Sequence, residues 1–366
     1  MITRSLKYFD WLFFAGIILL GAIGVMMIYS TGLAGKAENG LWLKQLAAAA
    51  LGLSGLFFFG TLDYRFFKKN GNLLYIISLV FLIAILIFAR SIRGSNRWFN
   101  LGFFNFQPAE FAKFALLLIL AKYFEERGHL LQRFRFVVLS FIYVLIPAGL
   151  LMLQPDIGSS LVILAIWFGV LFISPMPKRY FIYIIVAFLI VSVVAWQFVL
   201  VSYQKDRIRT FLDPVSDPLG RGYNVIQAMV ATGSGGIFGE GLARGLQSQL
   251  KFLPERQTDF IFASTVEELG LVGGSLVLLL FGLILWRMLR IIRASQDQFA
   301  TYLATGIFFL IFSQAIINVG MNLGLLPVTG ITLPFVSYGG SSLVITLWLA
   351  GIVESIAQHS VPVRFK

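Results

Sequence analysis

Long apolar runs alternate with short polar segments along the whole chain. An α-helix needs about 20 apolar residues to cross the roughly 30 Å hydrocarbon core of a bilayer, and the runs are close to that length. The pattern therefore predicts ten transmembrane helices, near residues 11–29, 43–60, 72–89, 108–124, 136–153, 159–174, 180–201, 261–286, 299–322 and 339–357. Neither strand alternation nor an internal repeat is visible. The predicted fold class is all-α, a single polytopic membrane domain over residues 1–366.

Charged residues between the runs predict the orientation of the helices. Positively charged short loops face the cytoplasm. Fifteen Lys and Arg lie on one side of the predicted helices, in segments 1–10, 61–71, 125–135, 175–179, 287–298 and 358–366. Both termini are therefore expected in the cytoplasm. The longest connection on the other side, residues 202–260 between the seventh and eighth helices, contains an amphipathic stretch and a glycine cluster, and we interpret it as a folded loop on the outer membrane surface.

Composition removes several classes of function. Hydrophobic residues make up 58% of the chain and charged residues only 13%, against roughly 25% charged in a soluble domain. The net charge of +12 is not arranged as a basic block with interleaved aromatics, so nucleic acid is not an expected partner. The absence of cysteine excludes disulfides and thiolate chemistry. Two histidines, His129 and His359, make a multi-histidine metal site an unfavoured interpretation.

Ionisable residues at the ends of the predicted helices are the main candidates for function, because each is costly in lipid and normally faces a cavity or a partner. Glu110 and Lys113 lie three residues apart at the start of the fourth helix and share one face with Gln107. Such spacing forms an ion pair within the helix. It also suits the polar wall of a cavity, and the sequence leaves both interpretations open.

Two aspartates precede helices on the outer side. Asp156 stands before the sixth helix and Asp259 before the eighth. Either is suited to cap its helix, and either is also placed to act as a functional carboxylate. Deeper in the eighth helix, Glu267 and Glu268 are adjacent and diverge by about 100°, so at least one is expected to face the bundle.

Other outer residues suit phosphate and sugar. Arg97 lies in an outer segment with Arg90 and Arg93, against the positive-inside tendency; these arginines serve either as surface anchors and salt-bridge partners or as phosphate ligands. Trp98 either packs on a sugar face or anchors its loop at the interface. Before the tenth helix, a glycine and serine motif either breaks and caps the helix or presents N–H groups to a phosphate; its candidate residues are Ser337, Gly339, Gly340 and Ser341.

Apart from Glu267 and Glu268, these candidates fall at the predicted outer ends of the helices, so any chemistry is expected outside the cytoplasm. Nucleoside triphosphates and nucleotide sugars are not available there, and the chain has no Walker A or Rossmann motif. A group-transfer reaction on that side needs a donor that is activated in advance. A lipid-linked diphosphate sugar meets this requirement.

Five motifs in order along the chain resemble the SEDS family (shape, elongation, division and sporulation). They are NRW at 96–98 with FQPAEFAK at 106–113, QPDIG at 154–158, TGSGGIFG at 232–239, QSQLKFLPERQTDF at 247–260 and PFVSYGGSS at 334–342. The segment at 247–260 is more similar to the RodA branch than to the FtsW branch. The resemblance runs from the first predicted helix to the tenth.

This resemblance implies a multi-pass peptidoglycan glycosyltransferase of the bacterial cytoplasmic membrane. It would polymerise lipid II on the outer side during cell elongation and shape maintenance, beside a class B penicillin-binding protein and in contact with membrane lipids. The catalytic aspartate of the family falls on Asp259. Many RodA-like sequences have His where this chain has Gln257, which removes a titratable neighbour of Asp259.

Chain growth needs a base and a sink for negative charge. Asp259 is the candidate base, and Arg97, Lys113 and the N–H groups before the tenth helix are the candidate sink. A divalent cation, Mg²⁺ or Mn²⁺, bridging the substrate diphosphate to Asp156 or Glu110 fits this mechanism; no organic cofactor is expected. Two alternatives remain: a lipid II transporter (flippase), although the polar residues gather at one rim rather than at midplane, and a non-catalytic scaffold for the penicillin-binding protein.

Overall fold

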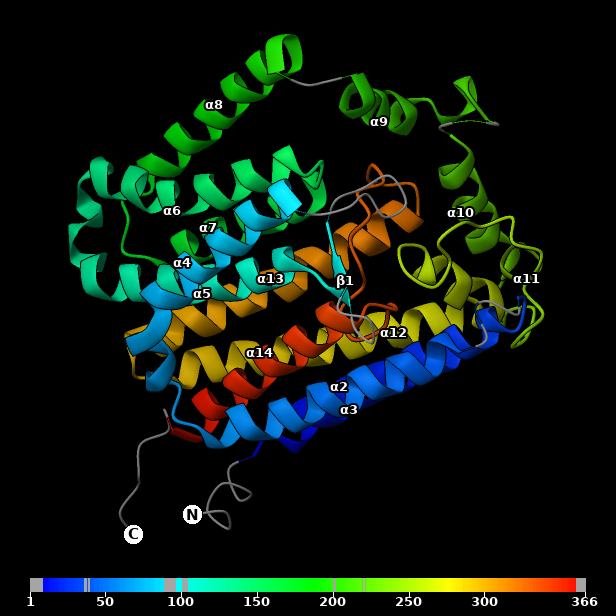
Figure 1. Cartoon of the computed structure of the whole chain (residues 1–366), viewed down its shortest axis with the longest axis horizontal. Helices are drawn as coiled ribbons and strands as arrows, with labels where there is room; N and C mark the ends of the chain where they lie inside the picture. The colour runs from blue at the N-terminus through cyan, green and yellow to red at the C-terminus, as the bar shows by residue number, and fades with distance from the viewer. Residues whose placement is uncertain are drawn as a thin grey trace.

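The computed structural model describes residues 9–35, 38, 40–88, 97–100, 105–199, 202–218, 220 and 222–359, and these are almost entirely helical (Figure 1). In chain order the elements are α2 (Trp11–Gly32), α3 (Leu41–Thr61), α4 (Arg65–Phe88), β1 (Phe99–Asn100), β2 (Asn105–Phe106), α5 (Pro108–Arg127), η1 (Gly128–Gln132), α6 (Phe134–Leu153), α7 (Ile157–Ile173), α8 (Arg179–Val194), η2 (Ala195–Val199), α9 (Ser202–Leu212), η3 (Pro214–Ser216), α10 (Tyr223–Ser234), α11 (Leu246–Gln249), α12 (Ile261–Ala294), α13 (Gln298–Asn322) and α14 (Gly340–His359).

A helix lies at each of the ten predicted apolar runs. Eight helices among the described residues are long and apolar enough to cross a membrane. The other two of the ten are α7, which has 17 residues, and α5, which carries charged residues near both ends. The polytopic, all-helical prediction is therefore confirmed. One departure is the antiparallel pair β1 and β2, two residues each, too short to leave an alternating pattern in the sequence.

Close packing of α3 against α14 forms one side of the bundle. The contact depends on glycine: a Cβ on Gly351 would lie 2.4 Å from the backbone oxygen of Leu56, and one on Gly52 would lie 2.4 Å from a side-chain carbon of Leu347. Small residues let transmembrane helices approach until their backbones nearly touch, and association in lipid depends on such van der Waals contact.

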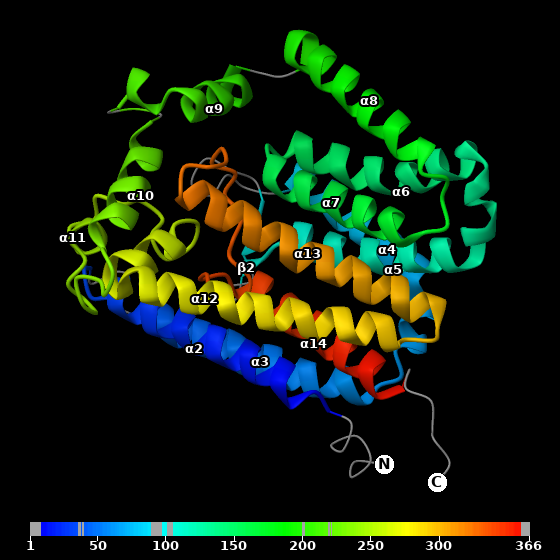
Figure 2. The same ribbon diagram turned by 180° about the vertical axis from the view of Figure 1, so that it is seen from behind.

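The beginning of α2 and the end of α14 meet at one end of the bundle (Figure 2). Asp10 caps α2 by accepting a bond from the Phe13 N–H, and its own N–H donates to Glu354 of α14 over 3.1 Å. Arg287 of α12 donates to both carboxylate oxygens of Asp10, at 3.0 and 2.8 Å. Three helices are thus joined by one buried polar cluster at the end opposite to α10 and α11.

Helix α8 lies apart from the rest, along the upper edge in Figure 1. It is fixed near its first turn, where the Tyr180 hydroxyl donates to the Gln132 carbonyl over 2.8 Å and its ring lies 5.1 Å from that of Phe134. Toward its other end its side chains are mostly exposed to the surroundings, and the chain continues through η2 to α9. The helix is therefore held at one end.

The glycine cluster of the long outer loop packs against a break in α12. Gly270 has a φ of 69° and interrupts the helix. The Glu267 and Glu268 carbonyls accept bonds from residues 240 and 241, and the N–H groups of residues 271 and 272 donate to residues 236 and 237, all within 3.1 Å. A Cβ on Gly239 would lie 2.2 Å from the Glu268 oxygen, which explains the glycine there. This part of the loop is folded and docked on a helix; its position on the membrane surface stays a prediction.

Candidate functional site

Asp259 lies two residues before α12, at the end of the bundle that carries α10 and α11. Its backbone carbonyl accepts two bonds, from the Nδ2 atoms of Asn318 at 2.9 Å and Asn322 at 3.0 Å. The Oδ1 of Asn322 also accepts the N–H of Ala263, 2.9 Å away, in the first turn of α12. Both asparagines are fully buried. Together they fix the backbone of Asp259 to α13.

The asparagine pair was not predicted from the sequence. The signal was present, because two amides four residues apart lie on one face of an otherwise apolar helix. Their partner is a backbone carbonyl, however, and no pattern of side chains identifies a carbonyl 59 residues away.

The carboxyl group of Asp259 has the electrostatics of a base. Burial and, after it, the negative charge of Glu255 raise the pKa of Asp259 to about 6, against the opposing effect of Arg207 and Arg97. A general base works best with a pKa near the operating pH. The Oδ2 atom would lie 3.4 Å from a Cβ on Gly330, so a glycine keeps that side of the carboxylate open.

Arg97 lies on the turn before α7. Its Nε donates to the Gln154 carbonyl over 3.0 Å, its Nη2 donates to the Pro155 carbonyl, and its Nη1 lies 4.0 Å from Asp156. Asp156 caps α7 by accepting bonds from the N–H and hydroxyl of Ser159, at 3.1 and 2.8 Å. Asp156 thus caps its helix, as one of its two interpretations predicted, and its role as a functional carboxylate stays a prediction. Arg90 and Arg93 lie outside the described residues.

The motif before α14 holds the segment beside Asp259. The Ser337 hydroxyl donates to the Thr258 carbonyl over 2.6 Å, and the Tyr338 N–H donates to the Gln257 carbonyl over 2.8 Å. The Gly339 N–H donates to Oε1 of Gln45 over 3.3 Å, so it is already occupied. Gly340 is the first residue of α14. In this structure the motif positions residues 257 and 258.

Ser341 links the short strand pair to α14. Its hydroxyl donates to the Asn105 carbonyl over 2.6 Å and accepts the backbone N–H of Gln107 over 3.2 Å. Trp98 is half-buried and directly precedes β1. The strand pair therefore places residues 97–98 and the start of α5 beside the start of α14.

Glu110 and Lys113 form the ion pair that their spacing predicts. The Lys113 Nζ lies 2.7 Å from the Glu110 Oε1, and both side chains are buried. Burying two charges is costly unless they are paired, and here they satisfy one another. Their contact with substrate stays a prediction.

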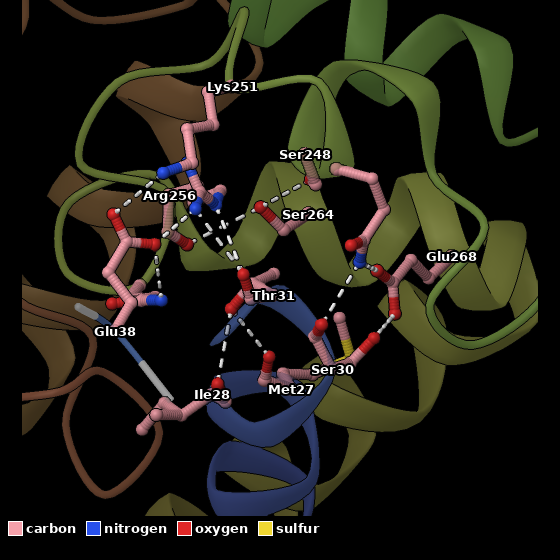
Figure 3. A network of polar contacts seen from close by, with 12 residues as sticks. Met27, Ile28, Ser30, Thr31, Glu38, Ser248, Lys251, Arg256, Ser264 and Glu268 are labelled. Carbon is pink, nitrogen blue, oxygen red and sulfur yellow. Dashed lines mark hydrogen bonds and ion pairs between the residues drawn. The ribbon is translucent and has the colours of Figure 1, made fainter. Parts of the chain in front are cut away.

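A second polar network surrounds the C-terminal end of α2 (Figure 3). Arg256 donates to Glu38 and to the Thr31 carbonyl, and Lys251 lies 3.8 Å from Glu38. Farther along, Ser30 donates to Glu268, which points toward α2.

Glu267, fully buried like Glu268, accepts the Gln247 N–H over 2.6 Å and the Ser248 hydroxyl over 2.5 Å. The adjacent glutamates thus hold the outer loop to α2 and α12.

Among the described residues no group of three or more His, Cys, Asp or Glu side chains is arranged to hold a metal ion. Asp156 accepts bonds from Ser159, and Glu110 pairs with Lys113 through its Oε1. A divalent cation that bridges the substrate diphosphate to one of these carboxylates stays a prediction.

Comparison with known proteins identifies relatives along nearly the whole chain. A family model described as "Cell cycle protein", which covers FtsW, RodA and SpoVE, matches residues 10–361. Peptidoglycan glycosyltransferase MrdB of Escherichia coli (strain K12) is 37% identical over 337 residues, 91% of either chain. A chain from a structure described as "Structural coordination of polymerization and crosslinking by a peptidoglycan synthase complex" matches with a TM-score of 0.81 and 35% identity, covering 95% of this chain and 97% of that one. The rod shape determining protein RodA of Thermus thermophilus matches with a TM-score of 0.70 and 29% identity, covering 97% and 98%.

Proposed function

Because the chain belongs to the FtsW, RodA and SpoVE family of cell cycle proteins, we propose that it is a peptidoglycan glycosyltransferase that polymerises lipid II into glycan strands on the outer side of the cytoplasmic membrane, in cell elongation and shape maintenance. The observation that carries this proposal is the Asp259 carboxyl group, half-buried, with its pKa raised to about 6 and two arginines acting on it.

In the proposed reaction, Asp259 removes the proton from a sugar 4-hydroxyl as the oxygen bonds to the anomeric carbon of a second lipid-linked sugar. The bond from that carbon to the lipid diphosphate breaks, and the diphosphate leaves with the electron pair. Arg97 and Arg207 stabilise the charge that develops on it, because guanidinium groups bind phosphate oxygens well. Loss of a general base typically lowers the rate about 10²–10⁴-fold.

The remaining candidates have supporting roles in this proposal. Lys113 with Glu110, and Gln107 at the start of α5, line the approach to the diphosphate, and Trp98 packs on a sugar face. Near Asp156, Arg97 is kept in place by the turn at 154–156. A divalent cation, Mg²⁺ or Mn²⁺, would bridge the substrate diphosphate to Asp156 or Glu110.

We also propose ten membrane spans, formed by α2 to α8 and α12 to α14, with both termini in the cytoplasm and residues 202–260 outside. The contact of Asp10 with Glu354 supports an even number of spans, since it joins the start of the first helix to the last helix. The fifteen Lys and Arg in the segments on the opposite side support the orientation.

A class B penicillin-binding protein is the proposed partner, in line with the coordination of polymerisation and crosslinking described for the similar synthase complex. The outer loop, with α9, α10 and α11, supplies surface beyond the ends of the spans for such a contact.

The test is polymerisation of lipid II by the purified protein with and without that partner. Asp259→Asn keeps the size and the capping ability of the residue but cannot act as a base, and we expect it to lower the rate about 10²–10⁴-fold while lipid II still binds. Asp213→Asn is the matched control, an exposed aspartate of the same loop.

A rate within a few-fold of the parent for Asp259→Asn would overturn the assignment of the base. A parent protein that makes no glycan but moves lipid II between leaflets would favour the transporter alternative. A parent with neither activity that stimulates its partner would favour the scaffold.

A further inference from the structure

A cavity of about 800 Å³ opens between α2 and α3, on the side of the bundle away from α8. Its volume is that of a small-molecule pocket. Apart from Gln45 its lining is apolar or aromatic, and Phe335, Leu343 and Leu347 complete the wall. Small residues on the two helices leave the space free; they are Gly21, Ala22 and Ala49. We refer to this cavity as the α2–α3 groove.

The α2–α3 groove has the length of one membrane leaflet. Along α2 it extends from Ile17 to Tyr29, which corresponds to about 18 Å at 1.5 Å per residue. Half of the hydrocarbon core is roughly 15 Å thick. Tyr29 and Trp42 stand at its outer end, with ring centroids 5.7 Å apart. Tyr and Trp gather at the level of lipid headgroups, so the groove follows an outer-leaflet lipid tail from headgroup level to midplane.

Gln45 connects the α2–α3 groove to the segment that carries Asp259. This buried side chain lines the groove, and its Nε2 donates to the Ser337 carbonyl over 3.0 Å. Ser337 in turn donates to the Thr258 carbonyl, one residue before Asp259. A molecule seated in the groove therefore touches the first member of a chain of bonds that ends at the candidate base.

We propose that the α2–α3 groove seats the isoprenoid tail of a lipid-linked diphosphate substrate and so sets the depth at which its sugar meets Asp259. The inference rests on the proposed function. A tail is favoured over a partner's membrane helix because the groove extends for only about 18 Å along α2, whereas a spanning helix would lie along roughly 30 Å of hydrocarbon.

The test fills the groove without disturbing the fold. A Cβ on Gly21 would meet nothing within 4 Å, and the same is true of Gly282 on α12, which does not line the groove. Gly21→Leu and Gly282→Leu are thus matched changes. Purified variants are assayed with lipid-linked disaccharide substrates that carry either a full-length or a much shortened isoprenoid tail.

We expect Gly21→Leu to raise KM for the full-length substrate about tenfold, the result of displacing a few tens of Å² of apolar contact, with little change for the short-tailed one. Gly282→Leu should leave both KM values unchanged. Equal KM values for the two variants with the full-length substrate would overturn the proposal while leaving the polymerase assignment intact.

A second measurement does not depend on activity. A full-length substrate with a photoreactive group in its isoprenoid tail should crosslink to peptides of α2 and α3, and less so in Gly21→Leu. Two other results would also overturn the inference. One is that an excess of anionic phospholipid abolishes crosslinking to α2 and α3; the other is that the photoreactive tail crosslinks only to a membrane helix of the partner. Failure of the parent to polymerise, with tail crosslinking retained, would count against the proposed function alone.

Discussion

Helices α14 and α8 use their apolar residues in opposite ways. In the most apolar 18-residue window of α14, 83% of the residues are buried inside the protein, whereas none are in the corresponding window of Arg179–Phe198. Yet α14 carries Ser341, Ser355 and Glu354. In a membrane the apolar helix is the one that faces lipid, because lipid tails are as apolar as leucine and give no drive to bury it. Polar residues and glycines mark the helices that pack against protein.

Asp259 lies where these two regions meet. From the packed region, Asn318 and Asn322 of α13 hold its backbone. From the other region, Arg207 of α9, which follows α8 in the chain, acts on its carboxylate charge. Helix α13 therefore sets the position of Asp259, and Arg207 of α9 lowers the pKa of its carboxyl group.

The comparison of α14 with α8 predicts that the largest effect on stability comes from substitutions that disturb helix packing. Gly351→Leu in α14 would drive a side chain into the backbone of α3, and overpacking of this kind costs about 1–3 kcal/mol or more. Ala187→Leu in α8 points into the surroundings and should change stability by less than about 0.5 kcal/mol. Thermal unfolding of the detergent-solubilised variants measures both. Gly149→Leu, with no atom within 4 Å of its Cβ, controls for loss of a helix glycine.

An intermediate effect is expected where the packed region holds the site. Asn322→Ala removes the 3.0 Å bond to the Asp259 carbonyl and the 2.9 Å bond to Ala263. A misplaced catalytic group typically costs up to about 10²-fold, so kcat should fall roughly 10–100-fold with KM much less affected. Asn70→Ala, which loses a bond to its own helix, is the control. A kcat unchanged in Asn322→Ala would remove the asparagine from the positioning of Asp259.

The smallest effect concerns charge. The pKa of Asp259 is raised to about 6. At a pH below this value the carboxyl group is protonated and cannot accept a proton, so the polymerisation rate should fall as the pH falls through it. Removing a cation in Arg207→Gln should raise this pKa and move the acid limb to higher pH. Removing a like charge in Glu255→Gln should move it to lower pH. Both shifts are expected to be a few tenths of a unit, and pH profiles that move in the same direction in both variants would contradict these opposite roles.

The sequence predicted the elements far better than their contacts. Runs of apolar residues identify helices because the requirement of the bilayer is local, and the boundaries of α2, α6 and α13 agree with the expected ranges within three residues. The family resemblance was confirmed over residues 10–361. It was this resemblance that singled out Asp259 as the catalytic carboxylate among the candidates. For Glu110 and Lys113 the sequence left open an ion pair or the wall of a polar cavity. The structure shows that the two side chains form an ion pair.

The features of the site that the sequence did not predict all depend on tertiary contacts. The asparagine pair of α13 recognises a backbone carbonyl, and Arg207 reaches the site only because α9 follows α8 across the outer end. Likewise, the sequence showed the glycine cluster but not its partner, which is the backbone of α12 beside Gly235 and Gly239. Patterns of side chains carry little information about partners that are backbone atoms.

The break in α12 also has a consequence for biogenesis. A helix inserted into the membrane satisfies its own backbone, but α12 cannot do so at Gly270, because two of its carbonyls and two of its N–H groups bond to residues 236–241. Those residues precede α12 in the chain and end on the outer side in the proposed orientation. Insertion of α12 is therefore complete only after the preceding loop has crossed the bilayer and docked. In the proposed orientation, the end of the bundle that carries Asp259 is therefore completed only on the outer side of the membrane.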